Sequence, residues 1–388
     1  MPRFTLPESV GDFLFGELRR KQALEKTLRA NFSLWGYDEV LPAGLDFFDN
    51  FTRGPGARPQ EGMLKSFDGS GRILAMRPEF TAQLARLAGS KLAVLPPPLR
   101  LCYLGPVYAG PQGKAGHLSE FTQAGVELMG PSSPEADAEV VLLALSLMRE
   151  AGLQGTMVEL GQIGFFKGLM EESGLRAEAI AELRAYVEQK NALAIELLLR
   201  DEKVPAEAAR RIMELPMLFG GGEVLQSAAK RGAGVRCAAA IENLRRIYEL
   251  VCACGFGDQV VIDLGMAPSL SYYTGLVFRG LTASLGRPVL TGGRYDGLLA
   301  EYGRDLPATG FALEVEGLLE ALLNETAEES RVDLIYAVDA RSFAEAFAEV
   351  SALRAQGLRV ELCFESDPEK IRARAAQRGA ARVMGVKE

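Results

Sequence analysis

The first long element that the hydrophobic pattern predicts is a helix near the N-terminus. Five apolar residues fall near helical spacing within residues 9–40, namely Leu14, Leu18, Leu24, Leu28 and Phe32. Side chains three and four positions apart share one face of a helix, so this spacing predicts a capped helix that Gly36 closes. Residues 37–51 then have the pattern of an extended strand that Pro42 interrupts.

The next segment predicts antiparallel strands. Residues 63–77 read as a hairpin with a glycine-rich turn, and residues 78–89 as a helix that begins with proline and glutamate. Residues 99–110 and 119–130 predict two more strands on either side of a loop. The glycine-rich stretches lack the strand–loop–helix setting of a P-loop or a dinucleotide fold, so both are rejected.

The remainder of the large domain predicts helices and then strands again. A helix follows Pro134 and a short strand begins at Met157, after which residues 166–255 are almost wholly helical. We interpret residues 166–255 as a helical insertion. Strands return from residue 260, and a helix ends near residue 323. The predicted large domain therefore spans residues 1–325.

The C-terminal part has a different pattern. After a polar stretch at residues 324–330, the order from Val332 is strand, helix, strand, helix, strand. Such a βαβαβ order predicts a small α/β domain over residues 331–388. The whole chain is therefore predicted to be α+β, with an antiparallel sheet flanked by helices, a helical insertion and a small C-terminal α/β domain.

Composition narrows the classes of function. The chain has 388 residues, 48% of them hydrophobic, which is enough for a large core. Its net charge of −8 argues against a nucleic-acid partner, because phosphate backbones are bound by clustered Lys and Arg. We expect no membrane span, since no stretch of about 20 apolar residues lacks charge, and no signal peptide is apparent. A cytoplasmic location is the expectation.

Cysteine and histidine content argue against metal and triad chemistry. The five cysteines show no metal-like grouping, and the pair Cys252 and Cys254 is too tight for a usual zinc site. We expect them to be reduced thiols. His117 is the sole histidine, which removes His-based metal sites and nearly all Ser-His-Asp schemes. We expect no metal and no cofactor.

Four short stretches suggest one ligand pocket. They offer Glu79 and Thr81; Glu120, Gln123 and Glu127; Tyr272, Tyr273 and Thr274; and Arg294, Tyr295 and Asp296. Carboxylate and amide oxygens accept hydrogen bonds from an ammonium group or an imidazole N–H, and tyrosines add flat walls. These residue types favour a small cationic or zwitterionic ligand. Taken singly, none is specific: Glu79 could simply cap a helix, and Tyr295 could be a buried residue beside a turn.

The order of these stretches resembles the catalytic core of class II histidyl-tRNA synthetases from about residue 4 to residue 323. "SYYTGLVF" and "GGRYDGL" resemble the two histidine-specific motifs of that family, "EFTQAGVE" its motif 2 strand, and "GFALEVEG" its motif 3. The resemblance implies that Glu79, Thr81 and Gln123 would hold an α-ammonium group. It also implies that Glu127 and Tyr273 would receive an imidazole, with Tyr272 and Tyr295 lining the pocket.

The chain departs from that family at its nucleotide site. Where the synthetases have an arginine that grips the α-phosphate, this sequence has Ala109, and Gly317 replaces the motif 3 arginine. Glu314 stands where motif 3 usually has glycine, and Pro268 and Ser271 replace an arginine and an aspartate. Adenylation needs fixed positive charge to orient ATP, and losing one such group typically costs about a hundredfold in rate.

The sequence retains the motifs that bind the amino acid, lacks the cationic residues of the nucleotide site, and has a short C-terminal domain. In these respects it is similar to the regulatory subunits of ATP phosphoribosyltransferase. That resemblance implies a non-catalytic, hetero-oligomeric role in the first step of L-histidine biosynthesis, with no tRNA. It implies a short-form catalytic subunit as partner, L-histidine as a feedback effector, and self-association of the core around residues 37–48.

Two alternatives remain open at this point. One is a divergent class II ligase that adenylates another carboxylate, in which Arg100, Lys114 or Arg279 would replace the missing cations. The other is a pure scaffold with a relic pocket.

Overall fold

The computed structural model describes residues 6–7, 9–52, 62–110, 119–230, 234–268, 272–322, 332–338 and 343–385. The chain separates into two compact units. The first comprises Met1–Gly11 and Ala23–Leu323, and the second comprises Asp12–Gln22 and Asn324–Glu388. Lys114, His117 and Ser271 lie outside the described residues. Each unit is treated below by itself.

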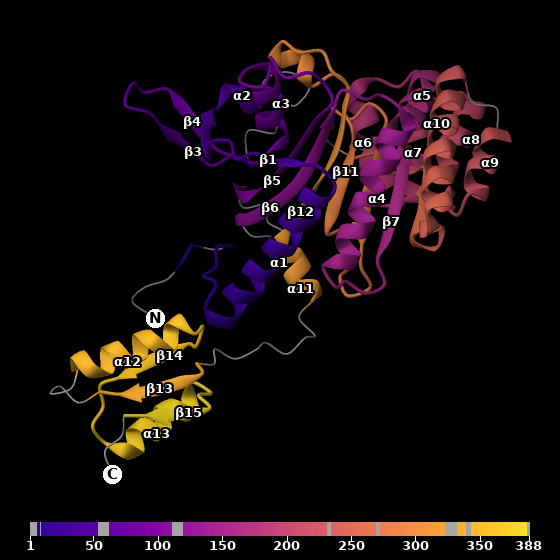
Figure 1. The fold of residues 1–388 in the computed structure, drawn as a ribbon. Coiled ribbons are helices and arrows are strands. Elements are labelled where there is room, and N and C mark those ends of the chain that lie inside the picture. Colours follow the sequence, from indigo (N-terminus) through magenta and orange to yellow (C-terminus); the bar gives the residue numbers. More distant parts are fainter. Residues whose placement is uncertain are drawn as a thin grey trace. The chain divides into compact units, whose positions relative to one another are not determined.

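A nine-stranded mixed sheet forms the centre of the first unit (Figure 1). Its strands, in spatial order, are β1 (Asp38–Glu39), β5 (Leu99–Tyr108), β6 (Glu120–Met129), β12 (Ala308–Glu314), β11 (Leu290–Arg294), β10 (Leu276–Leu281), β7 (Met157–Gln162), β9 (Val260–Asp263) and β8 (Phe219–Gly220). All pairs are antiparallel except β1–β5 and β7–β9. The predicted run of antiparallel strands is therefore confirmed, with parallel pairing added toward the edges.

The helices cover this sheet as the hydrophobic pattern predicted. They are α1 (Phe15–Leu34), α3 (Thr81–Gly89), α4 (Pro134–Glu150), α5 (Ile163–Ser173), α10 (Val235–Val251) and α11 (Val315–Ala321). In α1, Leu24, Leu28 and Phe32 are buried in the main core. The predicted apolar face is wrong at its start, because Leu14 precedes the helix and Leu18 is exposed. The same core takes in Leu147 of α4 and Leu244 of α10, so the helical side and the sheet share one apolar interior.

The predicted helical insertion is present, with one short interruption. Between α5 and α10 the chain forms α6 (Ala177–Glu188), α7 (Ala192–Asp201), α8 (Ala206–Glu214) and α9 (Glu223–Lys230). The two-residue strand β8 lies between α8 and α9 and pairs with β9. Buried residues of the insertion, such as Leu183 and Ile212, belong to the core cluster that also contains the sheet residues. The insertion therefore packs on the sheet and has no separate core of its own.

A small three-stranded sheet and a polar network order residues 45–90 of the first unit. The predicted hairpin is confirmed as β3 (Lys65–Phe67) and β4 (Ile73–Met76), and β2 (Leu45–Phe47) pairs with β4. The strand predicted up to residue 51 is wrong at its end, because Asp49–Thr52 forms helix α2. Asn50 of that turn donates a hydrogen bond of 2.8 Å to the Asp46 carboxylate, which closes the chain back on itself.

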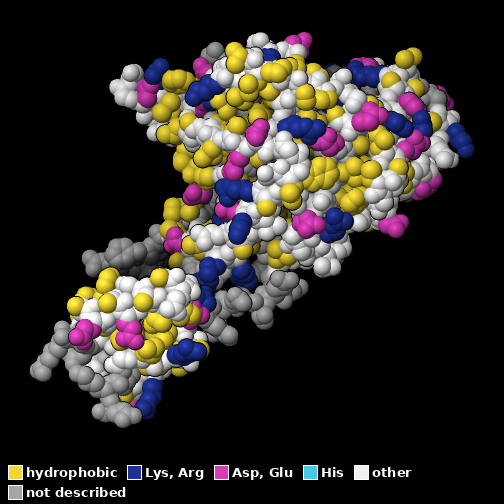
Figure 2. All heavy atoms as spheres, in the orientation of Figure 1, with side chains coloured by type: hydrophobic (Ala, Val, Ile, Leu, Met, Phe, Trp, Pro, Cys, Tyr) yellow, Lys and Arg dark blue, Asp and Glu magenta, His cyan; other side chains and the backbone are white. Residues whose placement is uncertain are grey.

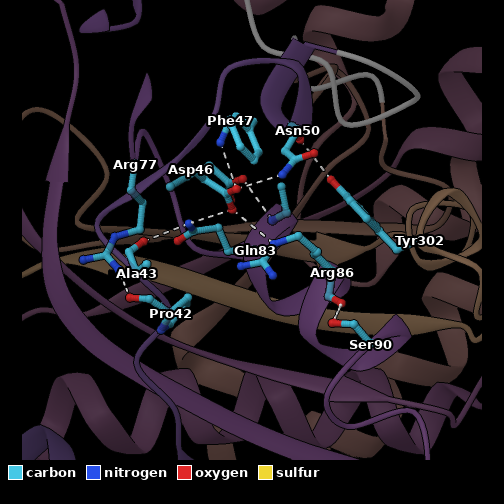
Figure 3. A network of polar contacts seen from close by, with 12 residues as sticks. Pro42, Ala43, Asp46, Phe47, Asn50, Arg77, Gln83, Arg86, Ser90 and Tyr302 are labelled. Carbon is cyan, nitrogen blue, oxygen red and sulfur yellow. Dashed lines mark hydrogen bonds and ion pairs between the residues drawn. The ribbon is translucent and has the colours of Figure 1, made fainter. Parts of the chain in front are cut away.

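Asp46 also ties this segment to α3, as Figure 3 shows. Its carboxylate accepts a hydrogen bond of 3.3 Å from Gln83 and forms an ion pair of 3.1 Å with Arg86. Gln83 donates a second hydrogen bond, of 2.9 Å, to the Ala43 carbonyl. These contacts fix α3 against the loop before β2. Helix α3 begins at Thr81, two residues after Glu79, so the network also supports two of the predicted site residues.

The second unit contains the predicted βαβαβ segment. Its parallel strands β13 (Leu334–Ala337), β14 (Val360–Cys363) and β15 (Arg382–Met384) lie in the order β14-β13-β15. Helices α12 (Phe343–Ala355) and α13 (Pro368–Gln377) connect them. Alternate residues of β13 face opposite sides: Ile335 packs with Ile371 of α13, and Tyr336 with Val350 of α12. The prediction of a small α/β segment is confirmed.

The surface carries charges of both signs. On the face in Figure 2, acidic and basic side chains are interspersed over the helical part of the core. All five cysteines are free thiols, and Cys102, Cys237 and Cys363 are buried. Within the described ranges, no helix is both long and apolar enough to cross a bilayer. No group of three His, Cys, Asp or Glu side chains in the described part of the chain could hold a metal ion.

Candidate functional site

A cavity of about 270 Å³ lies on one face of the sheet, over β6, β12 and β11. All seven residues that the sequence predicted for the pocket line this cavity: Glu79, Thr81, Gln123, Glu127, Tyr272, Tyr273 and Tyr295. Strand β6 pairs on both sides in an unbroken register, so residues of odd number on it share one face. Gln123 and Glu127 therefore point to the same side, whereas Glu120 lies on the opposite face and does not line the cavity.

Two glycines form the floor of the cavity. In the sheet register Glu127 lies opposite Gly310, and Gly310 lies opposite Gly293. A Cβ atom on Gly310 would come within 2.0 Å of Glu127 Oε2, and one on Gly293 within 2.8 Å of Tyr273 Cε1. The Glu127 side chain thus lies against the backbone of Gly310, and the Tyr273 ring lies against that of Gly293. A larger residue at either glycine would displace the side chain above it. These glycines were not singled out in the sequence, although their opposition to Glu127 follows once the strands are paired.

Glu127 is the most buried polar group of the cavity, with 1% of its surface exposed. Thr81 Oγ1 donates a hydrogen bond of 2.8 Å to its Oε1, and the Tyr295 hydroxyl donates to its Oε2. Burial raises the pKa of Glu127 to about 8, and these two donors only partly oppose the shift. The free protein therefore holds a largely protonated carboxyl here at neutral pH, surrounded by groups that can also stabilise its charged form.

Glu79 serves the local structure as well as the cavity. Its two oxygens accept hydrogen bonds of 2.6 Å and 2.9 Å from the backbone N–H groups of Thr81 and Ala82. Two N–H groups of the first turn of α3 are thereby satisfied, so Glu79, which precedes the N-cap residue Phe80, does help to cap this helix. Gln123 Oε1 accepts a weaker bond, of 3.3 Å, from the N–H of Phe80. A carboxylate has about four acceptor positions, so Glu79 keeps capacity for a ligand.

Three tyrosines form an aromatic wall of the cavity. The ring of Tyr272 lies 4.8 Å from that of Tyr273 and 5.7 Å from that of Tyr295, with both pairs inclined. Such inclined packing is favourable between aromatic quadrupoles. Lys167 of α5 donates a hydrogen bond of 2.8 Å to the backbone carbonyl of Tyr273. Burial lowers the pKa of Lys167. Nothing in the sequence indicated that a lysine of a distant helix would hold this tyrosine segment.

Other candidates from the same stretches have structural partners. Arg294 is buried and donates two hydrogen bonds of 3.0 Å to the Asp137 carboxylate in α4. It also pairs with Asp296, whose backbone N–H donates to Thr274 Oγ1. None of these residues lines the cavity. They brace the loop that carries Tyr295 and are not placed to contact a ligand.

The cations that could have replaced the missing arginines are engaged elsewhere. Arg100 forms a two-pronged ion pair with Glu139, and Arg279 pairs with Glu159 and Asp263. Neither lines the cavity, and no Lys or Arg among the described residues does. Lys114 and His117 lie outside the described residues. Ala109, which stands where the synthetases have the arginine that grips the α-phosphate, lines the cavity.

At the end of β12 the cavity wall is acidic. Glu314 lines the cavity, and its carboxylate accepts a hydrogen bond of 3.1 Å from Arg287. The Arg287 guanidinium lies 3.3 Å from the position of a Cβ on Gly317. The described part of the cavity therefore offers acceptors and negative charge at both ends, which suits an ammonium or imidazole group and disfavours a phosphate.

Comparison with known proteins identifies what the chain is similar to. The histidyl-tRNA synthetase family profile matches residues 9–318. A protein of Acetivibrio thermocellus named ATP phosphoribosyltransferase regulatory subunit is 38% identical over 98% of this chain and 92% of its own length. A protein of Desulforamulus reducens with the same name is 38% identical over 98% of this chain and 95% of its own.

Solved structures agree with these relatives. An ATP phosphoribosyltransferase regulatory subunit/histidyl-tRNA synthetase from Bacillus halodurans superposes with a TM-score of 0.87 at 28% identity, covering 98% of each chain. A histidyl-tRNA synthetase from a Nostoc species superposes with a TM-score of 0.80 at 18% identity, covering 98% of this chain and 90% of its own. At that identity the Nostoc protein shows a shared fold and no more.

Proposed function

Because this chain belongs to the family of ATP phosphoribosyltransferase regulatory subunits, within the histidyl-tRNA synthetase fold, we propose that it serves in the cytoplasm as the non-catalytic regulatory subunit of that enzyme. Its partner is then the short-form catalytic subunit that performs the first step of L-histidine biosynthesis. One observation supports this role most directly: the described part of the cavity keeps its carboxylates, amide and tyrosines, and no cation lines it.

We further propose that L-histidine is the occupant of the cavity and the feedback effector of the complex. Glu127, between Thr81 and Tyr295, would take the imidazole. Glu79 and Gln123 would accept hydrogen bonds from the α-ammonium group. Feedback requires that histidine bind one state of the complex more tightly than another, since a ligand with equal affinity for both shifts no equilibrium.

The pKa of Glu127 matches an imidazole ligand. A free imidazole has a pKa of about 6.5, so near pH 7 it is mostly neutral. Glu127, with a pKa of about 8, is mostly protonated in the same range. On contact the proton can pass from the carboxyl to the imidazole and leave an ion pair, without exchange with solvent. Calorimetric titrations near pH 7.2 in two buffers of different ionisation enthalpy should therefore give nearly equal heats.

The proposal is tested on the purified chain, alone and with its catalytic subunit. We expect catalytic activity to depend on this chain, histidine to inhibit the complex, and a calorimetric titration to show saturable histidine binding. Activity that is independent of the chain would contradict the regulatory role. Absence of histidine binding to both preparations would contradict the sensing role and leave a scaffold. Exchange of pyrophosphate into ATP by the chain alone would instead indicate a ligase.

Lys167 is expected to support ligand binding through Tyr273. Replacing Lys167 with methionine removes the hydrogen bond to the Tyr273 carbonyl. Because one such bond is worth about 1 kcal/mol, histidine affinity should fall about fivefold. Arginine at the same position should restore part of it, since a donor returns. Lys230→Met, at an exposed lysine of α9, is the matched control. Equal affinity in wild type and Lys167→Met would show that this contact does not position the tyrosines.

We also propose that the core self-associates around residues 37–48. Leu41, Leu45 and Phe47 expose 69%, 49% and 39% of their surfaces there. Exposed apolar residues gathered in one segment are typical of protein interfaces. Light scattering of the purified chain should give the mass of a dimer or a larger assembly, and Leu41→Glu should shift it toward the monomer.

A further inference from the structure

The cavity has a second end, away from Glu127. Strand β12 runs from Gly310, opposite Glu127, to Glu314, opposite Gln123. Four strand residues span about 13 Å, so Glu314 lies well beyond the reach of the group that contacts Glu127. Thr291 and Ala312, which are paired in the sheet, line the space between them. A ligand that fills the whole cavity must therefore place part of itself beside Glu314.

Glu314 belongs to an ion-pair cluster with an excess of negative charge. Arg287 donates one hydrogen bond of 3.1 Å to Glu314 and another of 2.8 Å to Glu320. One guanidinium thus serves two carboxylates, and the cluster has a net charge of −1. Glu320 is not among the residues that line the cavity, whereas Glu314 is. The carboxylate that lines the cavity is therefore also one of the two that bind Arg287.

We propose that Glu314 is a specificity-determining residue that closes this end of the cavity to phosphate-bearing ligands. It acts in two ways: its own charge repels an anion, and its hydrogen bond holds Arg287 away from one. The group accepted here is then neutral or cationic and carries no phosphate. This inference deepens the proposed function, because it defines the ligand class of the same cavity, and it rests on that cavity being a ligand site.

Both effects of Glu314, its own charge and its hold on Arg287, should change when glutamine replaces it. Glutamine at position 314 keeps the shape but removes the charge, so the net charge of the cluster becomes zero. Arg287 then retains Glu320 as its ionic partner, and the N–H groups that faced Glu314 can turn to an anion. Rejection by like charge is a common source of specificity. Both side chains are about one-third exposed, so solvent screens the effect and we expect about a tenfold change.

The test is equilibrium dialysis of ATP against the full-length chain without its catalytic subunit, which itself uses ATP. Wild type should bind ATP at least about tenfold more weakly than Glu314→Gln. Glu320→Gln is the matched control, because it removes a carboxylate from the same arginine outside the cavity, and it should behave as wild type. Adding Arg287→Ala to Glu314→Gln should reduce the gain to the part that comes from removing the Glu314 charge. Thermal unfolding of each variant establishes that it is folded.

Two outcomes would overturn the inference. One is equal ATP affinity in wild type and Glu314→Gln, and the other is an equal gain in Glu320→Gln, which would indicate a general charge effect. Histidine titrations on the same samples separate this inference from the proposed function. If Glu314→Gln gains ATP affinity while wild type binds no histidine, the inference stands and histidine sensing fails. If wild type binds histidine and Glu314→Gln shows no gain in ATP affinity, histidine sensing stands and the inference about Glu314 fails.

Discussion

Replacing Glu127 with glutamine is expected to weaken histidine binding by roughly tenfold to a hundredfold. The substitution keeps the shape of the side chain and an acceptor for Thr81 Oγ1, which now donates a hydrogen bond of 2.8 Å. It removes the group that can form a charged pair with an imidazole. Hydrogen bonds to charged groups are worth about 1.5–3 kcal/mol, and 1.4 kcal/mol corresponds to a factor of ten. In the complex, feedback inhibition should shift to higher histidine by a similar factor.

Calorimetry on the chain and inhibition curves on the complex measure this effect. Glu120→Gln is the matched control, since Glu120 is an exposed carboxylate of the same strand on its opposite face. It should leave both measurements unchanged. Unaltered feedback in Glu127→Gln, with complex formation intact, would mean that histidine acts at another site or that the cavity has no regulatory part.

The same substitution should change how stability depends on pH. The folded protein holds the Glu127 proton with a pKa of about 8, above the ordinary value of 4.5. Between these values the folded state binds more protons than the unfolded state, so its stability decreases as pH rises from about 4.5 to 8. Glu127→Gln removes this contribution. Thermal unfolding at several pH values should show a shallower decline in the variant, and identical slopes would contradict the raised pKa.

Replacing Gly310 with alanine is expected to give the largest loss of stability. The new Cβ would lie 2.0 Å from Glu127 Oε2 and 2.3 Å from the Val126 carbonyl oxygen. The carboxylate could turn away, but the carbonyl belongs to the β6–β12 ladder and cannot move without disturbing that pairing. Overpacking typically costs about 1–3 kcal/mol, and contacts this short place Gly310→Ala at the upper end of that range. The midpoint of thermal unfolding of the core should fall by roughly 5–10 °C.

Gly297→Ala, in the GGRYDGL motif, provides the comparison. Nothing lies within 4 Å of a Cβ at Gly297, so its alanine variant should unfold at nearly the wild-type temperature. Because Gly310 also lies under Glu127, its alanine variant should bind histidine poorly even below its unfolding midpoint. A Gly310→Ala protein as stable as Gly297→Ala would show that the floor of the cavity is looser than the strand register indicates.

Local pattern was sufficient for most of the elements. The hairpin turn, the helix at α3, the two long strands β5 and β6, and the βαβαβ tail all follow from short-range signals. Such signals work because strand alternation, helix starts and turns depend on residues a few positions apart. The segment predicted as a strand up to residue 51 was wrong at its end, since Asp49–Thr52 turns helical where Asn50 and Gln83 share the Asp46 carboxylate.

The identities of the cavity residues were also present in the linear sequence. Glu79, Gln123, Glu127 and the three tyrosines could be named because their motifs and the order of those motifs resemble histidyl-tRNA synthetases. The protonation state of these residues could not be predicted from the sequence. The pKa of Glu127 depends on burial between Thr81 and Tyr295, which are 46 and 168 residues away along the chain.

The contacts that close or support the cavity arise only when distant segments meet. Lys167 holds the Tyr273 carbonyl across 106 residues, and Arg287 is bound by Glu314 from a neighbouring strand. Arg294, which looked like a ligand residue beside Tyr295, is instead held by Asp137 in α4. A pattern of residue types specifies which side chains are available, whereas desolvation, charge pairing and steric closure depend on three-dimensional neighbours and are decided by packing.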